Sequence, residues 1–208
     1  MESCKIIFWD FDGVIKDSNE IKKDAFIKLF NFVKPEIKNK IEKHHFKNLG
    51  ISRYKKIPLY MKWANMKVSE ESVIVMSNKL SKILVNKVSN SKWVNGVYHY
   101  LKANYKKQTF ILLTATPQKE IELILKKINI YNNFYKIYGS PLDKTKVIKK
   151  FIFKNKINKN KLLFIGDSES DYRSALKNKI SFLLRKNVYN KKLQNYFNGI
   201  VFENLKNG

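Results

Sequence analysis

The sequence predicts an α/β protein with a parallel sheet and a helical block inserted after the first strand. Three observations predict this class. Short, unbroken apolar runs at 5–10, 109–114 and 161–165 are typical of strands buried on both faces of a sheet. Helical patterns separate the later strands along the chain, as parallel pairing requires. Residues 18–90 carry helical patterns and no strand pattern.

The inserted block contains four helical patterns, each with a start or stop signal. They run from Ser18 to Val33 with Pro35 closing the helix, from Glu36 to Leu49 with Gly50 ending it, from Ser52 to Ala64, and from Ser69 to Val88. Pro58 lies inside the third pattern. It predicts that this helix is kinked or begins late, because proline lacks the backbone donor that a helix interior needs.

Strands and helices alternate after residue 90. The expected elements are a helix at 96–105, a strand at 109–114, a helix from Pro117, a strand at 134–138, a helix from about Asp143, a strand at 161–165, a helix at 171–177 and a strand at 181–184. We expect a Rossmann-like core formed by 1–17 and 91–208, and an all-helical cap formed by 18–90.

Composition places the chain among globular proteins. It has 208 residues, of which 44% are hydrophobic and 13% aromatic, enough for a substantial core. No apolar run approaches the ~20 residues of a membrane span, so we expect no membrane contact. The N-terminal residues do not resemble a signal peptide, and the single Cys4 cannot form an internal disulfide. These features favour a cytoplasmic protein.

The net charge of +25 raises the question of a nucleic-acid partner. The lysines are spread along the whole chain and are not gathered into one stripe, and only three basic residues are arginines. We therefore do not expect nucleic acid to be the main partner. An attraction for small anionic substrates agrees equally well with this charge.

Polar residues of a distinctive kind follow the predicted strands. Asp10 and Asp12 follow the first strand, Thr114 ends the second, and Asp167 follows the strand at 161–165, while Lys144 lies at the start of a helix. In an open α/β sheet these positions meet at one edge, where ligands bind. Carboxylates, a hydroxyl, a lysine and helix N-termini suit phosphoryl transfer, because Mg²⁺ and lysine neutralise phosphate charge.

Together these motifs resemble the haloacid dehalogenase-like hydrolase superfamily, in its phosphatase branch. The four matching segments are Asp10-Phe11-Asp12-Gly13-Val14, Thr114, Lys144, and Gly166-Asp167 with Asp171, in the family's order and over nearly the whole chain. Each motif alone is weak, but all four in order are specific. The helical insertion resembles the mobile cap of that family.

The resemblance implies a role for each motif residue. Asp10 would be the nucleophile that forms an aspartyl-phosphate, and Asp12 would protonate the leaving oxygen and then activate water. Asp10, Asp167 and the backbone carbonyl of Asp12 would hold Mg²⁺. Asp171 would orient Lys144 or a metal-bound water from the second shell. Phosphate oxygens would be bound by Thr114, Ala115 and Lys144.

Several alternatives stay open at this stage. Thr114 could be an ordinary helix cap, and Lys146 and Lys149 compete with Lys144 for the place of the site lysine. A phosphomutase shares the core motifs with a phosphatase. A non-catalytic, basic nucleic-acid-binding protein on the same scaffold is the remaining alternative. Dehalogenation is disfavoured, because it needs no acid at Asp12.

The cap is expected to select the substrate. Arg53, next to a predicted tight turn at Gly50, is the best candidate for a substrate contact, with His45 as a second cap residue near the site. A closing cap excludes macromolecules. We therefore expect a small soluble phosphomonoester, such as a sugar, polyol, amino-alcohol or short-acid phosphate. The oligomeric state cannot be predicted from the sequence.

Overall fold

The structure is a computed structural model that describes Met1 and residues 4–205. The elements along the chain are β1 (Ile6–Trp9), α1 (Asn19–Leu29), α2 (Pro35–Lys47), α3 (Arg53–Trp63), α4 (Glu70–Ser89), α5 (Val97–Asn104), β2 (Thr109–Pro117), α6 (Gln118–Lys127), η1 (Tyr131–Asn133), β3 (Lys136–Ser140), α7 (Lys144–Asn155), η2 (Lys159–Lys161), β4 (Leu162–Gly166), α8 (Glu169–Asn178), β5 (Ser181–Arg185), α9 (Lys191–Tyr196) and β6 (Val201–Phe202).

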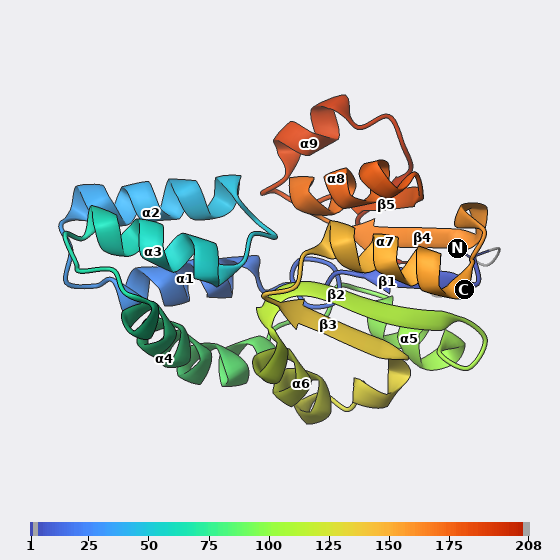
Figure 1. Ribbon diagram of the computed structural model, residues 1–208, viewed down its shortest axis with the longest axis horizontal. Helices are drawn as coiled ribbons and strands as arrows, with labels where there is room; N and C mark the ends of the chain where they lie inside the picture. Colours follow the sequence, from blue (N-terminus) through green and yellow to red (C-terminus); the bar gives the residue numbers. More distant parts are fainter. Residues whose placement is uncertain (2–3, 206–208) are drawn as a thin grey trace.

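The predicted fold class is confirmed. In the described part of the chain, six parallel strands form one sheet in the order β3-β2-β1-β4-β5-β6 (Figure 1). The first strand, β1, lies in the middle and pairs with β2 on one side and β4 on the other. The polar residues that follow these three strands are therefore brought to one edge of the sheet.

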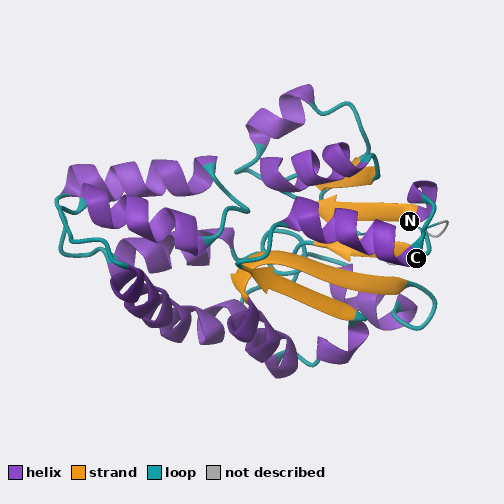
Figure 2. Cartoon of the chain, viewed as in Figure 1, coloured by secondary structure: helices purple, strands orange, loops and turns teal. Residues whose placement is uncertain are grey.

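Alternation of side chains along β1 explains why both faces of the sheet are covered. Ile7 and Trp9 belong to the hydrophobic cluster that includes α5 and α6, whereas Phe8 packs in a second cluster with Ile148 of α7 and Ala175 of α8. In a strand, successive side chains point to opposite faces. An unbroken apolar strand therefore needs helices on both sides, and Figure 2 shows them there.

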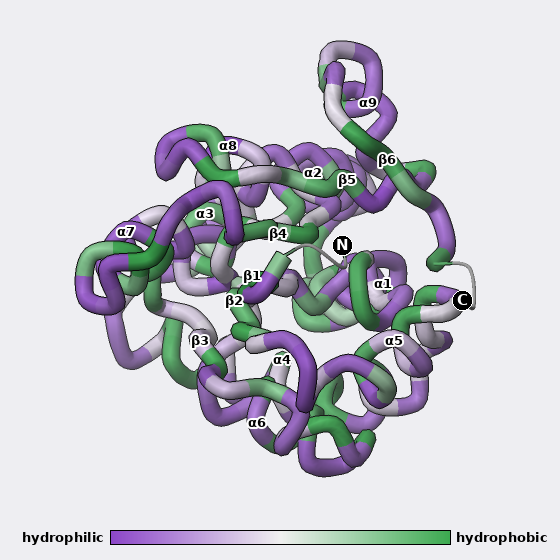
Figure 3. The backbone as a smooth tube through the Cα atoms, turned by 90° about the vertical axis from the view of Figure 1, so that its right-hand side faces the viewer, coloured by the Kyte–Doolittle hydropathy of each residue, from purple (hydrophilic) through white to green (hydrophobic). Residues whose placement is uncertain are grey.

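The hydrophobic segments are concentrated in the centre of the sheet. Figure 3 shows β1, β2 and β4 largely in green at the middle of the molecule, with hydrophilic helices and loops around them. Over the described residues, none of the helices combines the length and the apolar character that crossing a membrane would require.

Helices α1 to α4, here called the cap, lie beyond the carboxyl ends of the strands (Figure 1). The larger hydrophobic cluster continues from β1 into the cap through Phe26, Phe30 and Tyr60. The two connections between cap and sheet lie side by side, because the backbone N–H of Asp17 donates to the carbonyl of Lys92 at 2.8 Å. We propose that the cap comprises residues 18–90 and that this pair of connections is its hinge.

Proline positions account for two differences from the sequence prediction. Helix α1 ends at Leu29, before the predicted Val33, and Pro35 opens α2 as its first residue. The first turn of a helix tolerates proline, because its missing N–H would be unpaired there. Pro58 neither delays nor ends α3, which begins directly after its cap Ser52 and continues to Trp63.

The other differences lie near strand ends and in the C-terminal part. Helix α8 begins at Glu169, earlier than predicted, because Ser168 and Asp171 form a reciprocal capping box. Strand β2 extends past Thr114 through a register shift to Pro117, which pairs with Ser140. The short elements α9 and β6 were not predicted, since their sequences carry too few apolar residues for a periodic pattern.

Candidate active site

Asp10 and Lys144 meet at the carboxyl end of β1. The Lys144 ammonium donates to Asp10 Oδ1 at 2.7 Å and to Asp171 Oδ1 at 2.6 Å, and all three side chains are buried. Lys144 is the first residue of α7, whose N-cap is Asp143. Lys146 is exposed, as is Lys149. The structure therefore brings Lys144 to the predicted nucleophile and leaves the two competing lysines outside the site.

Three carboxylates form a cluster at this edge. Asp10, Asp167 and Asp171 each place one oxygen within 4.8 Å of the others. Asp167 Oδ2 accepts hydrogen bonds from Asn19 of α1 at 2.8 Å and from Asn187 at 2.9 Å. These two amides fix the orientation of Asp167 toward Asp10.

Burial and mutual repulsion raise two pKa values in this cluster. The pKa of Asp10 is raised well above its ordinary value, first by burial and then by the charge of Asp171, although Lys144 opposes the shift. The pKa of Asp167 rises to about 7, again first by burial and then by Asp171. One ammonium does not neutralise three carboxylates, so the cluster favours an additional positive charge.

The donor set fits a hard divalent cation. Asp171 uses Oδ1 for Lys144 and Oδ2 for Ser168, so the oxygens left for a metal belong to Asp10 and Asp167. Gly13 lies close to Asp167: it has a φ of +75°, and a Cβ there would lie 2.0 Å from Asp167 Oδ2. Carboxylate oxygens without nitrogen or sulfur donors are typical of Mg²⁺ sites.

Asp12 is held by a different set of partners. Its Oδ1 accepts from the Ser18 hydroxyl at 2.6 Å, and its Oδ2 accepts from Thr116 Oγ1 at 3.0 Å and from the Lys22 ammonium. Burial raises the pKa of Asp12, but the charge of Lys22 and these hydrogen bonds outweigh burial and hold the pKa below its usual value. Asp12 is therefore ionised in this state.

Thr114 and Ala115 lie in β2, the strand that pairs with β1. The Thr114 hydroxyl oxygen accepts from the backbone N–H of Thr116 at 3.1 Å, which leaves its own proton available to a ligand. Ala115 lines the cavity beside Asp10. The alternative that Thr114 caps the next helix is wrong, because the N-cap of α6 is Pro117 and Thr114 lies within β2.

The two predicted cap residues line the same cavity with different partners. Arg53 donates to Glu120 of α6 at 2.7 Å and to the Ser81 hydroxyl at 2.9 Å, so its guanidinium bridges α3, α4 and α6. His45 is buried, and its Nδ1 has no hydrogen-bond partner. Burial lowers the pKa of His45 well below its usual value, helped by the charge of Lys56, so its ring is neutral.

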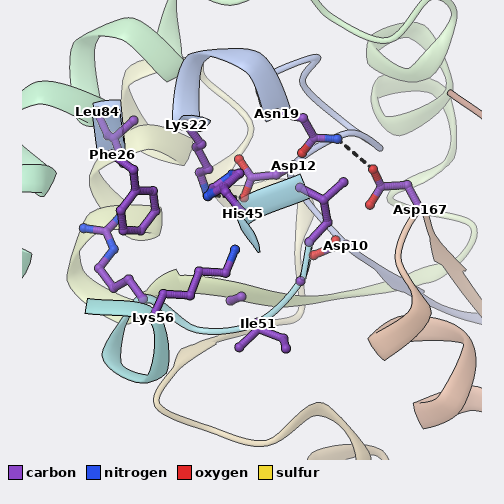
Figure 4. A pocket seen from close by; sticks show the side chains of 14 residues that line it. Asp10, Asp12, Asn19, Lys22, Phe26, His45, Ile51, Lys56, Leu84 and Asp167 are labelled. Carbon is purple, nitrogen blue, oxygen red and sulfur yellow. Dashed lines mark hydrogen bonds and ion pairs between the residues drawn. The ribbon is translucent and has the colours of Figure 1, made fainter. Parts of the chain in front are cut away.

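The cavity is enclosed between sheet and cap (Figure 4). It is lined by Asp10, Asp12, Asn19, Lys22, Phe26, His45, Leu49, Gly50, Ile51, Arg53, Lys56, Leu84, Ala115 and Asp167. Its volume is about 50 Å³, room for only one or two water molecules. The loop at Gly50 closes it, because a Cβ there would lie 2.3 Å from the hydroxyls of Ser168 and Ser170.

Sequence reasoning missed four residues of this site. Lys22, Lys56, Thr116 and Glu120 are buried or half-buried around the cavity. A weak signal was available for Lys22, which lies one helical turn before Phe26 on the buried side of α1. Lys56 stood out only as half of the Lys55-Lys56 pair, with no role assigned to it. Thr116 and Glu120 gave no signal, because threonines and glutamates at these spacings are normally solvated.

Replacing Asp167 with Asn should stabilise the metal-free protein near neutral pH. Between the ordinary value of 3.8 and the raised pKa of about 7, the folded protein binds more protons than the unfolded chain. The wild type therefore loses stability as pH rises through this window, and the variant lacks that loss. We expect the variant's advantage in unfolding free energy to grow to roughly 1–3 kcal/mol by pH 7.5.

The difference in unfolding free energy between Asp167→Asn and the wild type can be measured by denaturant unfolding from pH 4.5 to pH 7.5, with a chelator present to keep the protein free of metal. Asp24→Asn is the matched control, because Asp24 is exposed on α1, and its difference from wild type should not change with pH in this way. Adding Mg²⁺ should stabilise the wild type and the control more than Asp167→Asn. If the stability advantage of Asp167→Asn stays constant over this pH range, the pKa of Asp167 is not raised in the folded protein.

A match to a protein-family model identifies the class of protein. Residues 6–185 match the model described as haloacid dehalogenase-like hydrolase. The match covers well over half of the chain, so the protein belongs to this family and the predicted resemblance is confirmed. No curated protein matches the chain.

Solved structures share the fold over nearly the whole chain. A predicted phosphoglycolate phosphatase from Haemophilus somnus is 17% identical, with a TM-score of 0.74 and coverage of 97% of this chain and 95% of that one. CbbY from Rhodobacter sphaeroides, in complex with xylulose-(1,5)bisphosphate, is 10% identical, with a TM-score of 0.77 and coverage of 97% and 94%. Beta-phosphoglucomutase from Clostridium difficile is 18% identical, with a TM-score of 0.70 and coverage of 97% and 91%.

Proposed function

We propose that this protein is a Mg²⁺-dependent phosphatase that hydrolyses a small phosphomonoester through an aspartyl-phosphate. One observation carries the proposal: Asp10, held by Lys144, and Asp12, held by Lys22, line a single closed cavity with different partners. Two carboxylates in different environments are suited to separate roles as nucleophile and as acid or base. Membership of the hydrolase family agrees with this chemistry.

The first half of the reaction is an in-line displacement. A carboxylate oxygen of Asp10 attacks phosphorus, the bond from phosphorus to the ester oxygen breaks, and Asp12 gives a proton to the leaving oxygen. In the second half, Asp12 takes a proton from water while that water attacks phosphorus. The bond to Asp10 breaks, and inorganic phosphate and the free carboxylate result.

Asp12 must gain a proton before it can donate one. In the ligand-free site its pKa is lowered by Lys22, Ser18 and Thr116 despite burial. The negative charge of an arriving phosphate raises the pKa of a neighbouring carboxyl. A phosphomonoester, with a second pKa of about 6, can also arrive carrying a proton. Substrate binding thus favours the protonated form that the first step needs.

The oxygens of Asp10 and Asp167 would hold Mg²⁺, which would neutralise charge on the transferring phosphoryl group. Lys144 balances the charge between Asp10 and Asp171, which keeps the Asp10 oxygen directed into the site. Thr114 and the backbone N–H of Ala115 would donate to phosphate oxygens, as the motif resemblance implies. The free hydroxyl proton of Thr114 and the position of Ala115 on the cavity wall support this role.

The substrate must be small, because the cap closes over it. A cavity of about 50 Å³ admits no macromolecule, so the cap has to open for entry and close for chemistry. One structural neighbour is a predicted phosphoglycolate phosphatase, and another was solved in complex with xylulose-(1,5)bisphosphate; both compounds are small phosphate esters. A small metabolite phosphate is therefore the class that the site supports best.

A release assay tests this function. The wild type should liberate inorganic phosphate from 4-nitrophenyl phosphate with Mg²⁺ present, and a chelator should abolish the release until Mg²⁺ is restored. Release that persists unchanged in chelator would reject the metal-dependent mechanism. With sugar phosphates, isomerisation without release of inorganic phosphate would favour a phosphomutase.

A further inference from the structure

Lys56 enters the cavity from the cap. It lies on α3, its side chain is 4% exposed, and Figure 4 shows its amine directed into the space between the cap and Asp10. Within the described part of the chain it has no carboxylate partner and no hydrogen-bond acceptor. The ring of Phe26 has its centroid 5.9 Å from the amine, and the charge of Asp12, which is itself paired with Lys22, acts on the amine without a hydrogen bond.

The other cations that line this cavity already have counterions. Lys22 is paired with Asp12, and Arg53 is paired with Glu120 at 2.7 Å. Of the lysines and arginines on the cavity wall, Lys56 alone is left without one among the described residues. A buried ammonium without a paired counterion is costly, and the pKa of Lys56 falls to about 7, first through burial and then through the charge of Lys22, although the charge of Asp12 opposes the shift.

A second unpartnered polar atom lies in the same wall. His45 Nδ1 is buried without a hydrogen-bond partner, and His45 lines the cavity together with Lys56. The rest of this side is apolar, with Phe26, Leu49 and Ile51. A ligand that completes the site therefore needs an anionic end that faces Lys56 and a short carbon chain that fits the apolar wall.

We propose that Lys56 binds a second anionic group of the substrate, a carboxylate or a second phosphate, joined by a short carbon chain to the phosphate that faces Asp10. This inference rests on the proposed function and narrows its substrate class. A charge-assisted hydrogen bond in a buried cavity favours such a substrate over one with an uncharged end by about tenfold to a hundredfold.

Three esters with the same three-carbon chain test the proposal. They are propyl phosphate, 3-phosphonooxypropanoate and 1,3-propanediol bisphosphate, which end in a methyl group, a carboxylate and a second phosphate. We expect the wild type to have a kcat/KM at least about tenfold higher for one of the two anionic esters than for propyl phosphate. The preferred ester identifies which anion Lys56 binds.

The variant Lys56→Met should lose most of this preference, and Lys56→Gln should behave similarly if the methionine variant does not fold. Lys55→Met is the matched control, because Lys55 is exposed on the same helix, and it should keep the wild-type preference. A wild type that releases phosphate from all three esters equally would overturn the inference and leave the proposed function intact. A preference that persists in both Lys56 variants would also overturn it.

Binding gives a readout that does not depend on turnover. Calorimetry with Asp10→Asn as the background should show tight binding of the preferred anionic ester, and adding Lys56→Met should weaken it by at least about tenfold. If no ester is hydrolysed by the wild type but this binding difference is found, the proposed function fails while Lys56 remains an anion site. If binding is equal with and without Lys56, the anion site is refuted.

Discussion

Replacing Asp10 with Asn is expected to abolish phosphate release. An amide cannot attack phosphorus, and no other carboxylate in the described structure lies where Asp10 does, between Lys144 and the cavity. Loss of a nucleophile that acts as part of a unit costs orders of magnitude, and we expect kcat to fall by at least about 10³-fold.

The variant should remain folded. The raised pKa of Asp10 shows that the buried site favours an uncharged group there without metal, and Asn supplies one of the same shape. Wild-type enzyme quenched during turnover should carry an acid-stable, hydroxylamine-sensitive phosphoryl group, whereas Asp10→Asn should carry none. Asp24→Asn, the same change at an exposed position, should leave both measurements unchanged. Labelling of Asp10→Asn equal to that of wild type would place the nucleophile elsewhere.

Replacing Glu120 with Ala is expected to have the largest effect on stability. Glu120 accepts from Arg53 at 2.7 Å and also from the Ser81 hydroxyl, and both members of the ion pair are buried. Removing one partner leaves an uncompensated guanidinium between cap and core. Broken buried pairs of this kind cost about 3–5 kcal/mol, although opening of the cap would let water reach Arg53 and reduce the loss.

Denaturant unfolding and hydrogen exchange distinguish a protein in which Arg53 stays buried and unpaired from one in which the cap opens. A loss of about 3 kcal/mol in unfolding free energy would show that Arg53 stays buried, whereas faster amide exchange confined to α3 and α4 would show that the cap opens. Glu122→Ala is the control on the same helix: among the described residues the only side-chain hydrogen bond of Glu122 is with Gln118, one turn away, and the change should cost about 0.5 kcal/mol or less. An unchanged unfolding free energy together with unchanged exchange would show that the pair contributes nothing.

The sheet was predictable because its strands carry a strong local signal. Ile7, Phe8 and Trp9 are apolar without interruption, and this pattern arises only where both faces are buried. The edge that holds the candidate site followed from topology, since Asp10 and Asp167 directly follow two neighbouring strands. These predictions needed no knowledge of how the cap packs.

The cap side of the site could not be predicted in the same way. Arg53 was expected to contact substrate, but its partner is Glu120, a residue 67 positions away in the chain. Lys22 and Lys56 are ordinary lysines in a chain with many of them. Where their amines lie depends on how α1 and α3 approach the sheet, which is a property of tertiary packing that local patterns do not encode.

Under the proposed function, the close approach of Gly50 to the loop that follows β4 would affect the rate of turnover as well as its specificity. A Cβ at position 50 would touch the hydroxyls of Ser168 and Ser170, which lie shortly after Asp167, a proposed metal ligand. The surfaces that would exclude water during chemistry would also have to separate before inorganic phosphate could leave. Turnover would then depend on a compromise at one contact: a looser fit would admit water during the reaction, and a tighter one would retain the product.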